Sequence, residues 1–396
     1  MRGWKAAPLG DLATIVGGGT PARDKGEYFG GSIPWVTPKD MKCWEIIGAQ
    51  ETLTELGVAN SAARLVEPNS VLVVVRSGVL KHTLPVAINR VRVAINQDMK
   101  ALLCDADQVE PDYLARFLKY SSTRILASVR ATTADNFPIE VLRRLSVPLP
   151  SGVEQRRIAD VLDRAEALQA KRRVSLVQLD ALLESVFLEM FGDPACNSQC
   201  WPTVGLGELL SVPLRNGTSP SKAGRISGKV LTLSAITGAG FDPTACKECM
   251  FSTVPPRGQT VDQSDFLVCR GNGNLRLVGR GFFPTYKMED VAFPDTMIAV
   301  RVSPGRVERR FLQFLWNSKA VRLQIEKLAR TTNGTLKINQ AMLEGIKLIA
   351  PPLERQRKFE SVAHEIDQMR SAYNRSQMEL NSLFASLQHR AFTGAL

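Results

Sequence analysis

The sequence contains two copies of one segment, and this duplication constrains the fold more than any other feature. PLPSGVEQRRIADVLD occupies residues 148–163, and APPLERQRKFESVAHE occupies residues 350–365. Aligning Gln155 with Gln356 gives an offset of 201 residues, which continues without a gap to the end of the chain. A single two-fold repeat of this length indicates two copies of a domain-sized unit rather than a solenoid of short repeats.

A long helix is predicted after the prolines of each copy, because proline interrupts the preceding element and a new helix starts after it. Apolar residues then recur at steps of three and four, the heptad pattern of a helix with one buried stripe. At 1.5 Å per residue, each helix would be on the order of 50 Å long. The stripe of the first copy consists of Ile158, Val161, Ala165, Leu168, Leu179, Leu182 and Val186, and that of the second consists of Phe359, Val362, Ile366, Met369, Tyr373, Leu380, Leu383 and Leu387.

Polar residues interrupt both stripes at the same place, at Arg172 and Ser175 in the first copy and at Ser376 in the second. A helix of this kind is stable only when its stripe is buried. We therefore predict that the two helices pair as an antiparallel coiled coil, which would relate the halves by pseudo-two-fold symmetry. The alternative is that each is an amphipathic helix lying on its own domain.

A globular region precedes each helix, and both regions show the same order of patterns. Short β-type runs separated by Gly, Pro, Asn and Asp come first. These runs are followed by a helix (110–129 or 307–329), a polar turn, a short helix and a strand that leads into the prolines. This order predicts an α/β (α+β) domain present twice. The predicted boundaries are 1–150 for the first domain, 151–193 for the first helix, 194–352 for the second domain and 353–396 for the second helix.

Composition favours a non-membrane protein with a polyanionic partner. In 396 residues, no apolar run approaches the roughly 20 residues that a membrane helix needs. The N-terminal stretch has no apolar signal core, and the seven cysteines are an odd number, so we expect a reducing, cytoplasmic location. The net charge is +11, and residues 194–352 carry 20 basic against 11 acidic side chains. Such a surplus is typical of nucleic-acid-binding proteins, with a merely basic surface as the alternative.

A series of motifs runs through the chain in a specific order. They are PLGDLATIVGGGTP, GGSIPWVTPKDM, AINQDMKALL, YLARFLKYSS and PLPSGVEQRRIADVLD, then FGDP, VGLGELLSV, RGNGNLRLVG, FPDTMIAVRV and APPLERQRK. In these motifs the chain resembles the DNA specificity (S) subunit of bacterial Type I restriction-modification systems, over essentially its whole length. It departs at Arg76-Ser77-Gly78-Val79, where the family often has a more glycine-rich turn, and at Lys358-Phe359, where the family usually has isoleucine.

The resemblance implies two target-recognition domains that each read one half of a split site in double-stranded DNA, with the helices as spacer and docking platform. It also implies that methylation and cleavage reside on other subunits, so this chain would be non-catalytic. It would assemble two modification (methyltransferase) subunits and restriction subunits. S-adenosylmethionine, ATP and Mg are expected on those partners, and no cofactor in this chain. The predicted docking residues are Gln155, Arg156, Arg157, Gln356, Arg357 and Lys358.

Candidate DNA-binding residues follow from the chemistry of the duplex. Phosphates are bound by Lys and Arg, while base edges are read by Arg, Asn, Gln or Thr. Such residues gather in the loops 130–136, 213–222, 270–276 and 330–337, for which a solvated turn is the alternative. The predicted DNA-binding residues are Thr20, Thr37, Lys39, Arg76, Lys81 and Arg130 in the first half, and Arg215, Asn216, Thr218, Arg270, Asn272, Asn274, Arg276, Thr332 and Asn333 in the second.

Catalytic motifs are missing from the sequence. There are three histidines, no GxxxxGK[ST] loop and no Asn-Pro-Pro-Phe-type element of adenine methyltransferases. A solitary two-lobed DNA-binding nuclease nevertheless stays open as an alternative. Two close cysteine pairs, Cys196 with Cys200 and Cys246 with Cys249, have a spacing that structural zinc sites use, so a zinc-containing DNA-binding protein is the other alternative.

Overall fold

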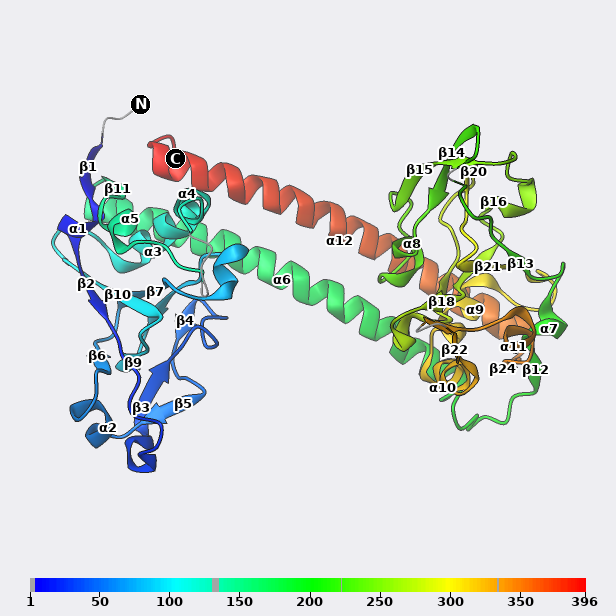
Figure 1. Cartoon of the computed structure of the whole chain (residues 1–396), viewed down its shortest axis with the longest axis horizontal. Helices are drawn as coiled ribbons and strands as arrows, with labels where there is room; N and C mark the ends of the chain where they lie inside the picture. Colours follow the sequence, from blue (N-terminus) through cyan, green and yellow to red (C-terminus); the bar gives the residue numbers. More distant parts are fainter. Residues whose placement is uncertain (1–3, 130–134, 222, 333–334) are drawn as a thin grey trace. The chain divides into compact units, whose positions relative to one another are not determined.

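The computed structural model describes residues 4–129, 135–221, 223–332 and 335–396. The chain divides into two compact units. Unit 1 consists of Met1–Val174 and Asn374–Leu396, and unit 2 consists of Ser175–Tyr373. The division therefore crosses both long helices at the polar interruption of their stripes, so each unit contains one globular region and half of each helix (Figure 1).

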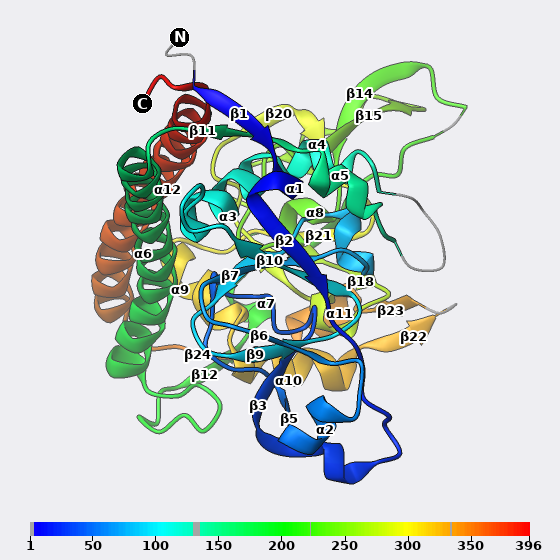
Figure 2. The same cartoon turned by 90° about the vertical axis from the view of Figure 1, so that its left-hand side faces the viewer.

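Unit 1 contains a central sheet with the strand order β2-β10-β7-β8-β4. Its neighbours are antiparallel except that β4 runs parallel to β8, and Figure 2 shows β2, β10 and β7 side by side. A second sheet has the order β5-β3-β9-β6 with β3 and β9 parallel at its centre, and β1 pairs with β11. The strands are β1 (Lys5–Pro8), β2 (Ala13–Gly17), β3 (Phe29–Val36), β4 (Glu45–Ile46), β5 (Glu51–Leu53), β6 (Arg64–Val66), β7 (Ser70–Val74), β8 (Val86–Asn89), β9 (Val93–Ile95), β10 (Met99–Cys104) and β11 (Ser146–Leu149).

Unit 2 repeats this topology. Its central sheet has the order β13-β21-β17-β19, its second sheet has the order β15-β14-β20-β16 with β14 and β20 parallel, and β12 pairs with β24. A further small sheet has the order β18-β23-β22. The predicted duplication is thereby confirmed, although among the described residues β4 has no counterpart in unit 2 and the small sheet has none in unit 1. The strands are β12 (Thr203–Gly205), β13 (Arg215–Asn216), β14 (Ile226–Leu231), β15 (Cys246–Phe251), β16 (Thr260–Val261), β17 (Phe266–Cys269), β18 (Gly271–Asn272), β19 (Gly281–Phe282), β20 (Met288–Ala292), β21 (Met297–Val300), β22 (Arg330–Thr332), β23 (Thr335–Lys337) and β24 (Lys347–Ile349).

Short helices accompany the sheets of both units. The helix predicted at 110–129 is two helices that meet at Ser121, and the one predicted at 307–329 is broken at Asn317 and Ser318. The Asn317 side chain donates to the Gln313 carbonyl (2.9 Å) and thus competes with the helical backbone bonds. The short helices are α1 (Leu9–Leu12), α2 (Glu55–Ala59), α3 (Pro111–Tyr120), α4 (Ser122–Leu126) and α5 (Ile139–Arg143) in unit 1, and α7 (Leu206–Leu209), α8 (Ser234–Thr237), α9 (Arg309–Trp316), α10 (Lys319–Leu328) and α11 (Gln340–Glu344) in unit 2.

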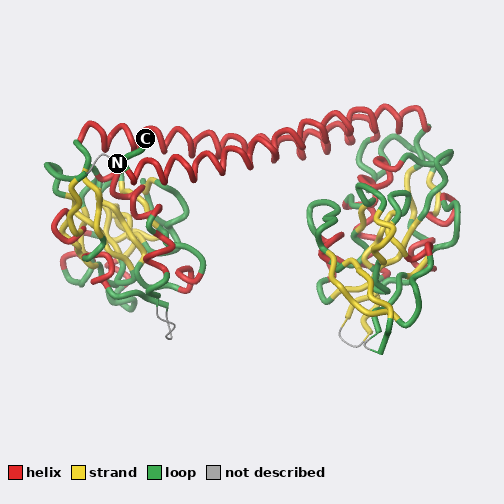
Figure 3. The backbone as a smooth tube through the Cα atoms, turned by 90° about the horizontal axis from the view of Figure 1, so that it is seen from above, coloured by secondary structure: helices red, strands yellow, loops and turns green. Residues whose placement is uncertain are grey.

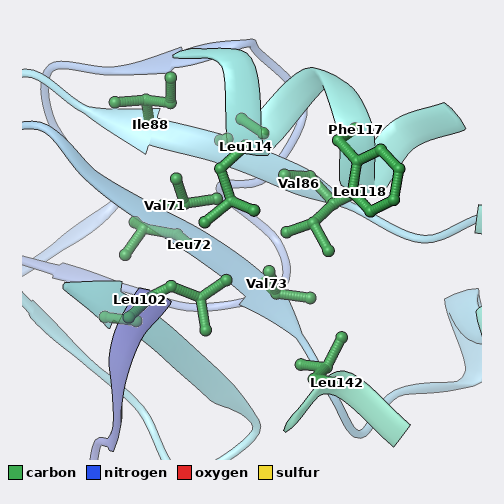
Figure 4. Close-up of a cluster of buried hydrophobic side chains, with 14 of the residues drawn as sticks. Val71, Leu72, Val73, Val86, Ile88, Leu102, Leu114, Phe117, Leu118 and Leu142 are labelled. Carbon is green, nitrogen blue, oxygen red and sulfur yellow. The ribbon is translucent and has the colours of Figure 1, made fainter. Parts of the chain in front are cut away.

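The core of unit 1 lies between α3 and the central sheet. Leu114 and Leu118 are four residues apart and therefore share one face of α3. They lie against Val71 of β7 and Val86 of β8, and all four side chains are buried (Figure 4). Each fully buried leucine contributes about 1.5–3 kcal/mol relative to an exposed one. α9 occupies the equivalent place in unit 2, with Leu312 and Trp316 buried.

The two long helices are α6 (Gly152–Phe191) and α12 (Leu353–Thr393), with 40 and 41 residues, so each is about 60 Å long. In unit 1 the N-terminal part of α6 packs beside the C-terminal part of α12, where Gln169 donates to the Leu380 carbonyl (3.3 Å). In unit 2 the ends are reversed, and Phe187 packs on Phe359 with ring centroids 5.3 Å apart. The predicted antiparallel pairing is confirmed in both units (Figure 3). Among the described residues, neither these helices nor any other is apolar enough along its length to cross a membrane.

The predicted stripe is partly wrong. Four of its members remain about half exposed, namely Leu168 (54%), Leu182 (48%), Met369 (51%) and Leu383 (54%). The residue that follows each of them is more buried; these four residues are Gln169, Leu183, Arg370 and Phe384. The helices are therefore rotated slightly relative to the predicted register, and these four residues lie at the seam. The exposed residues therefore flank the seam at matching positions of the two copies.

Each long helix ends in an aromatic cluster. Phe392, at the end of α12, packs on Tyr113, Phe117 and Tyr120 of unit 1, with ring centroids 5.6, 5.3 and 5.0 Å away. Phe191, at the matching position of α6, packs on Phe311 of unit 2 at 4.9 Å. Both phenylalanines are buried. The C-terminal end of each helix thus completes the core of one unit.

The start of each long helix is bonded to its globular region by a buried glutamine. The Gln155 side chain accepts from the Glu110 backbone N–H (2.9 Å) and donates to the carbonyls of Gln108 (3.0 Å) and Pro150 (3.1 Å). Gln356 accepts from the Glu308 N–H (2.9 Å) and donates to the Pro351 carbonyl (2.8 Å). Their exposed fractions are only 2% and 1%. Glu110 and Glu308 are the N-cap residues of α3 and α9, so the glutamines fix each long helix against the helix that covers the core.

We predict that Gln155→Ala and Gln356→Ala each destabilise the chain by about 1–3 kcal/mol, because buried backbone groups lose their partners. Gln178, which is exposed on α6, provides the control, and Gln178→Ala should change stability by no more than about 0.5 kcal/mol. Urea unfolding of the full chain measures the effect. Equal unfolding midpoints for all three variants and the wild type would contradict this role.

Candidate nucleic-acid interface

In unit 1, predicted DNA-binding residues gather where the strands of the central sheet end. After β7, Arg76 forms a backbone bridge with Asn136, and the Ser77 N–H donates to the Asp135 carbonyl (2.9 Å). The 3-10 helix η2 (Gly78–Lys81) follows directly. Thr20, after β2, bonds to Gln97 in the turn before β10. Thr20, Arg76 and Lys81 therefore belong to one end of the sheet.

The basic side chains at this end form ion pairs on the surface. Arg76 pairs with Asp98 (2.5 Å) and Lys81 with Asp135 (3.3 Å), with 45% and 63% of the basic side chains exposed. The Arg76–Asp98 pair is partly exposed on both sides and contributes at most about 1 kcal/mol, so Arg76 can exchange this carboxylate for another anion. Asp135 is buried, so Lys81 is its partner at the surface and is held more firmly.

Thr37 and Lys39 lie in the turn after β3. The backbone N–H and hydroxyl of Thr37 donate to the Asp40 carboxylate at 2.9 and 2.8 Å, so this threonine caps its own turn. Lys39 is exposed. The Val36 carbonyl at the end of β3 accepts from the Asn96 N–H (3.1 Å), which places the turn next to the one before β10.

In unit 2, the small sheet joins two of the predicted loops. β18 pairs with β23, and β23 pairs with β22, so Gly271 and Asn272 lie beside Lys337 and Leu336. The Ile338 N–H also donates to the Arg270 carbonyl (2.9 Å). The arrangement matches unit 1, where the segment after β7 bonds to residues 135–136. Sequence reasoning named these loops separately, and the structure brings them together.

The side chains of the 270–276 loop are largely turned to its surface. Asn272 and Asn274 accept from the backbone N–H groups of Asn274 (2.9 Å) and Arg276 (3.0 Å), which shapes the loop. Arg270 donates to the Asp295 carbonyl (3.3 Å). Arg276 is exposed. Asn216 is exposed too, and the Thr218 N–H donates to the Phe293 carbonyl (3.0 Å) near the end of β20.

Arg215 makes contacts within unit 2 that the sequence did not predict. Its guanidinium pairs with Asp265, which is fully buried, and donates to the Gly258 carbonyl (3.1 Å). Arg301 binds the same carboxylate through Nε (2.8 Å), and this hydrogen bond is the main reason that the pKa of Arg301 is raised. A buried carboxylate needs such partners because its desolvation is costly. Arg215 therefore supports the fold of unit 2 through Asp265, and a buried aspartate has no sequence signal that would have revealed it. Its contact with DNA stays a prediction.

Three predicted residues cannot be placed by their side chains. Arg130 and Asn333 lie outside the described residues, and for Thr332 only the backbone, in β22, is described.

The predicted docking residues divide into two kinds. Gln155 and Gln356 are buried inside the chain and cannot contact a partner, so their prediction as docking residues is wrong. The four basic residues are at the surface, each in an ion pair. Arg156 pairs with Glu110, Arg157 with Glu154 (2.7 Å), Arg357 with Glu308 (2.9 Å) and Lys358 with Glu354 (3.2 Å).

The cysteine pairs are not assembled into a metal site. Within the part of the chain that the structure describes, no group of three or more His, Cys, Asp or Glu side chains is placed to hold a metal ion. Cys246 and Cys249 lie three residues apart on β15, so their side chains point to opposite faces of the strand. Cys196 and Cys200 are exposed in the segment after α6.

The N-terminal half matches a known family. Residues 1–176 match the model of the Type I restriction modification DNA specificity domain. The match covers somewhat less than half of the chain. The EcoR124I/EcoR124II specificity subunit of Escherichia coli is 34% identical over 168 residues, which cover 42% of this chain and 41% of the relative. The StySPI specificity subunit of Salmonella potsdam is 26% identical over 312 residues, which cover 73% of this chain and 66% of the relative. The chain thus spans between two fifths and two thirds of the length of these relatives.

Solved structures extend the likeness of fold to the whole chain. The S subunit of a Type I restriction-modification system from M. genitalium is 15% identical, with a TM-score of 0.58, and the match covers 98% of this chain and 96% of that one. A chain from a structure describing complex assembly and conformational transition of the type I system is 17% identical, with a TM-score of 0.63 over 100% and 99% of the two chains. Both units and both long helices are therefore parts of the specificity-subunit fold.

Arg215, which pairs with a buried carboxylate, and Arg276, which is exposed, should differ in how much they contribute to the stability of unit 2. We expect Arg215→Ala to destabilise unit 2 by about 1–3 kcal/mol, because Asp265 loses one of its cationic partners. Arg276→Ala should have an effect within about 0.5 kcal/mol, because this side chain is exposed. Thermal or urea unfolding of both variants makes the comparison. If Arg215→Ala were as stable as the wild type, the pair with Asp265 would not support the fold.

Proposed function

We propose that this chain is the sequence-specific DNA-recognition subunit of a Type I restriction-modification complex. In this proposal residues 1–150 and 194–352 are two target-recognition domains, and each reads one half of a split site in double-stranded DNA. The observation that carries it is the duplicated polar end of the central sheet. In unit 1, Arg76 follows β7 and forms a backbone bridge with Asn136, which follows α4. In unit 2, β18 follows β17 and pairs with β23, which follows α10.

The residues at these two ends suit both kinds of DNA contact. Lys39, Arg76 and Lys81 in unit 1 and Arg270 and Arg276 in unit 2 can neutralise phosphates, which supplies most non-specific affinity. Base reading requires side chains with donor and acceptor groups, and Thr20, Asn216, Thr218, Asn272 and Asn274 carry them. Loops from two different chain segments form each end, so a single domain can change its target through loop residues without altering its core.

We assign the docking of two modification subunits to the exposed apolar residues that flank the helix seam. In an antiparallel pair, residues at the same flanking position of the two helices lie on the same side of the seam. Leu168 and Leu383 occupy that position in unit 1, and Leu182 and Met369 occupy it in unit 2. The two sets are related by the offset of 201 residues. Two equivalent apolar surfaces are what two copies of one partner require.

The remaining parts of the proposal follow from this role. The chain would be non-catalytic and would act in the cytoplasm, where restriction subunits would join the assembly. S-adenosylmethionine would be held by the modification subunits, and ATP and Mg by the restriction subunits. The solitary nuclease gains no support from the relatives, which are named as specificity subunits.

DNA binding by unit 2 can be tested at Arg276. We expect Arg276→Ala to weaken binding of a duplex that contains the methylated site by about 1–3 kcal/mol if the guanidinium reads a base. If it contacts a phosphate, the loss should be similar for all sequences, and the slope of log K against log salt should fall by about one. The control is Arg306→Ala, because Arg306 is exposed but its guanidinium bonds to the Glu208 carbonyl of α7. Equal affinities for both variants and the wild type at several salt concentrations would remove this loop from the interface.

The docking surfaces can be tested one at a time. Leu182→Glu should weaken the binding of one modification subunit at least tenfold, because about 1.5–3 kcal/mol of apolar burial is lost. Leu168→Glu should affect the other subunit, and the double variant should bind neither. Val177, which is 69% exposed on α6 but away from the flank, provides the control Val177→Glu. Native mass spectrometry counts the subunits, and a wild-type complex that saturates at one would contradict the proposal.

A further inference from the structure

The proposed DNA-contacting loop of unit 2 connects β17 to β19 and is closed by backbone hydrogen bonds. The Cys269 N–H donates to the Arg280 carbonyl (2.8 Å), and the Gly279 N–H donates to the Cys269 carbonyl (2.7 Å). The 3-10 helix η4 (Leu275–Leu277) lies within the loop and carries Arg276. The position of η4 therefore decides where the guanidinium of Arg276 is presented.

Arg322 of α10 holds the backbone around η4. Its Nη1 donates to the Val278 carbonyl (2.6 Å) and to the Arg276 carbonyl (3.4 Å). The Arg276 N–H donates to the Asn274 side chain (3.0 Å). Both backbone polar groups of Arg276 are thus bonded, one within the loop and the other to α10. A hydrogen bond from a charged donor is roughly twice as strong as one between neutral groups, so the bond to α10 is a firm one.

The side chain of Arg322 is itself fixed. It is 22% exposed, and its Nε lies 3.1 Å from the carboxylate of Glu326, one turn further along α10. Burial lowers the pKa of Arg322, but a guanidinium stays charged at neutral pH. Because it is bonded on two sides, this guanidinium has little freedom to move. It therefore fixes the position of the carbonyls that it binds.

The end of the loop also packs closely on α9 and α10, at Gly279. The φ of Gly279 is +76°, in the left-handed region, and a Cβ atom there would lie 2.7 Å from Ile325 of α10. The indole Nε1 of Trp316 on α9, which is buried, donates to the Gly279 carbonyl (2.7 Å). The loop thus rests on both helices, and Arg322 makes the contact that reaches η4.

Unit 1 holds the corresponding loop, between β7 and β8, in a different way. There the Ser77 N–H donates to the Asp135 carbonyl (2.9 Å), and Lys81 pairs with the Asp135 carboxylate (3.3 Å). α4 has 5 residues, whereas α10 has 10. No side chain of α4 forms a hydrogen bond or an ion pair with the described residues of that loop. Support of the loop by the second helix is therefore particular to unit 2.

On the basis of the proposed function, we propose that Arg322 is a positioning residue for the second half-site. It acts through the backbone of Arg276 and Val278 and does not itself contact DNA. Reading a base edge through paired hydrogen bonds requires that the side chain be held within about 0.5 Å of its productive position. Without Arg322, η4 would lose its bond to α10, and Arg276 would no longer be held in this way.

Gln324, two residues further along α10, provides a matched control. Its side chain accepts from the Lys347 N–H (2.8 Å) and donates to the Lys347 carbonyl (2.9 Å) in β24. Arg322→Leu and Gln324→Leu therefore both remove hydrogen bonds between α10 and a backbone segment of unit 2, but only the bonds of Arg322 go to the loop. Arg322→Lys is the conservative variant, because it keeps the charge and can reach one carbonyl.

Each full-length chain is produced with its modification subunit in a host that has no adenine methylation of its own, and methylated adenines in the host genome are mapped. We expect the same split motif for the wild type and Gln324→Leu. Arg322→Leu should keep the first half of the motif, while methylation of sites with a wrong base in the second half rises at least about fivefold. Arg322→Lys should give a smaller rise. Urea unfolding should show lower midpoints for both leucine variants.

Three results would count against this role. A wild-type second half-motif for folded Arg322→Leu would show that Arg322 only stabilises unit 2. An equal broadening for Gln324→Leu would attribute the effect to general destabilisation, and the positioning role would be overturned as well. If Arg322→Leu does not fold, Arg322→Lys decides, because a broadened second half supports the role and an unchanged motif overturns it. The proposed function fails separately, if the wild-type chain directs methylation to no defined split motif.

Discussion

The burial of one phenylalanine at the end of each long helix is the interaction on which the rest of the structure depends. Phe392 completes the aromatic cluster on α3, and Phe191 completes the one on α9. At the other end, each helix is bonded to its globular region by a buried glutamine. Removing either contact would leave tens of residues of amphipathic helix without a packed end, and such a helix is not stable alone. The two units therefore share both helices and cannot be separated without exposing a core.

The duplication has been kept in the cores and changed at the edges. The second sheets have the same strand order in both units, and so do the first four strands of the central sheets. The caps of α3 and α9 by glutamine are also the same. Differences appear where a strand or loop lies at an edge. β4 with Trp44 covers β8 in unit 1, whereas Gln313 and Asn317 close the edge of β19 in unit 2. Few buried contacts depend on a strand or loop at the edge of a sheet, so sequence changes are tolerated there. For the same reason the two sheet edges can take on different functions.

The sequence predicted the duplication, the long helices and their antiparallel pairing, because heptad spacing and repeated prolines are local signals. It misjudged the seam at Leu168 and Leu182, since a rotation of the helix by a fraction of a turn is decided by the partner helix. It read Gln155 and Arg215 as surface residues, because a polar side chain looks the same in the sequence whether it binds a partner protein or a buried backbone group. Asp265 and Arg322 were not singled out, since their contacts are with residues that lie far away in the sequence.

The order of layers in each unit separates the polar loops from the long helices. In unit 1, α6 contacts α3 through Arg116 and Asp163, and α3 packs in turn on β7 and β8. The polar loops begin only where β7 ends, so a change at Arg76 or Lys81 alters no residue that contacts a long helix. The same order holds in unit 2, from Asp367 through Arg310 of α9 to β17 and the 270–276 loop. A chain built in this way can exchange its polar loops, which we propose contact DNA, while its apolar flank at Leu168 and Leu182 stays constant. Partner subunits that contact only the flank would then follow every change of target without changing themselves.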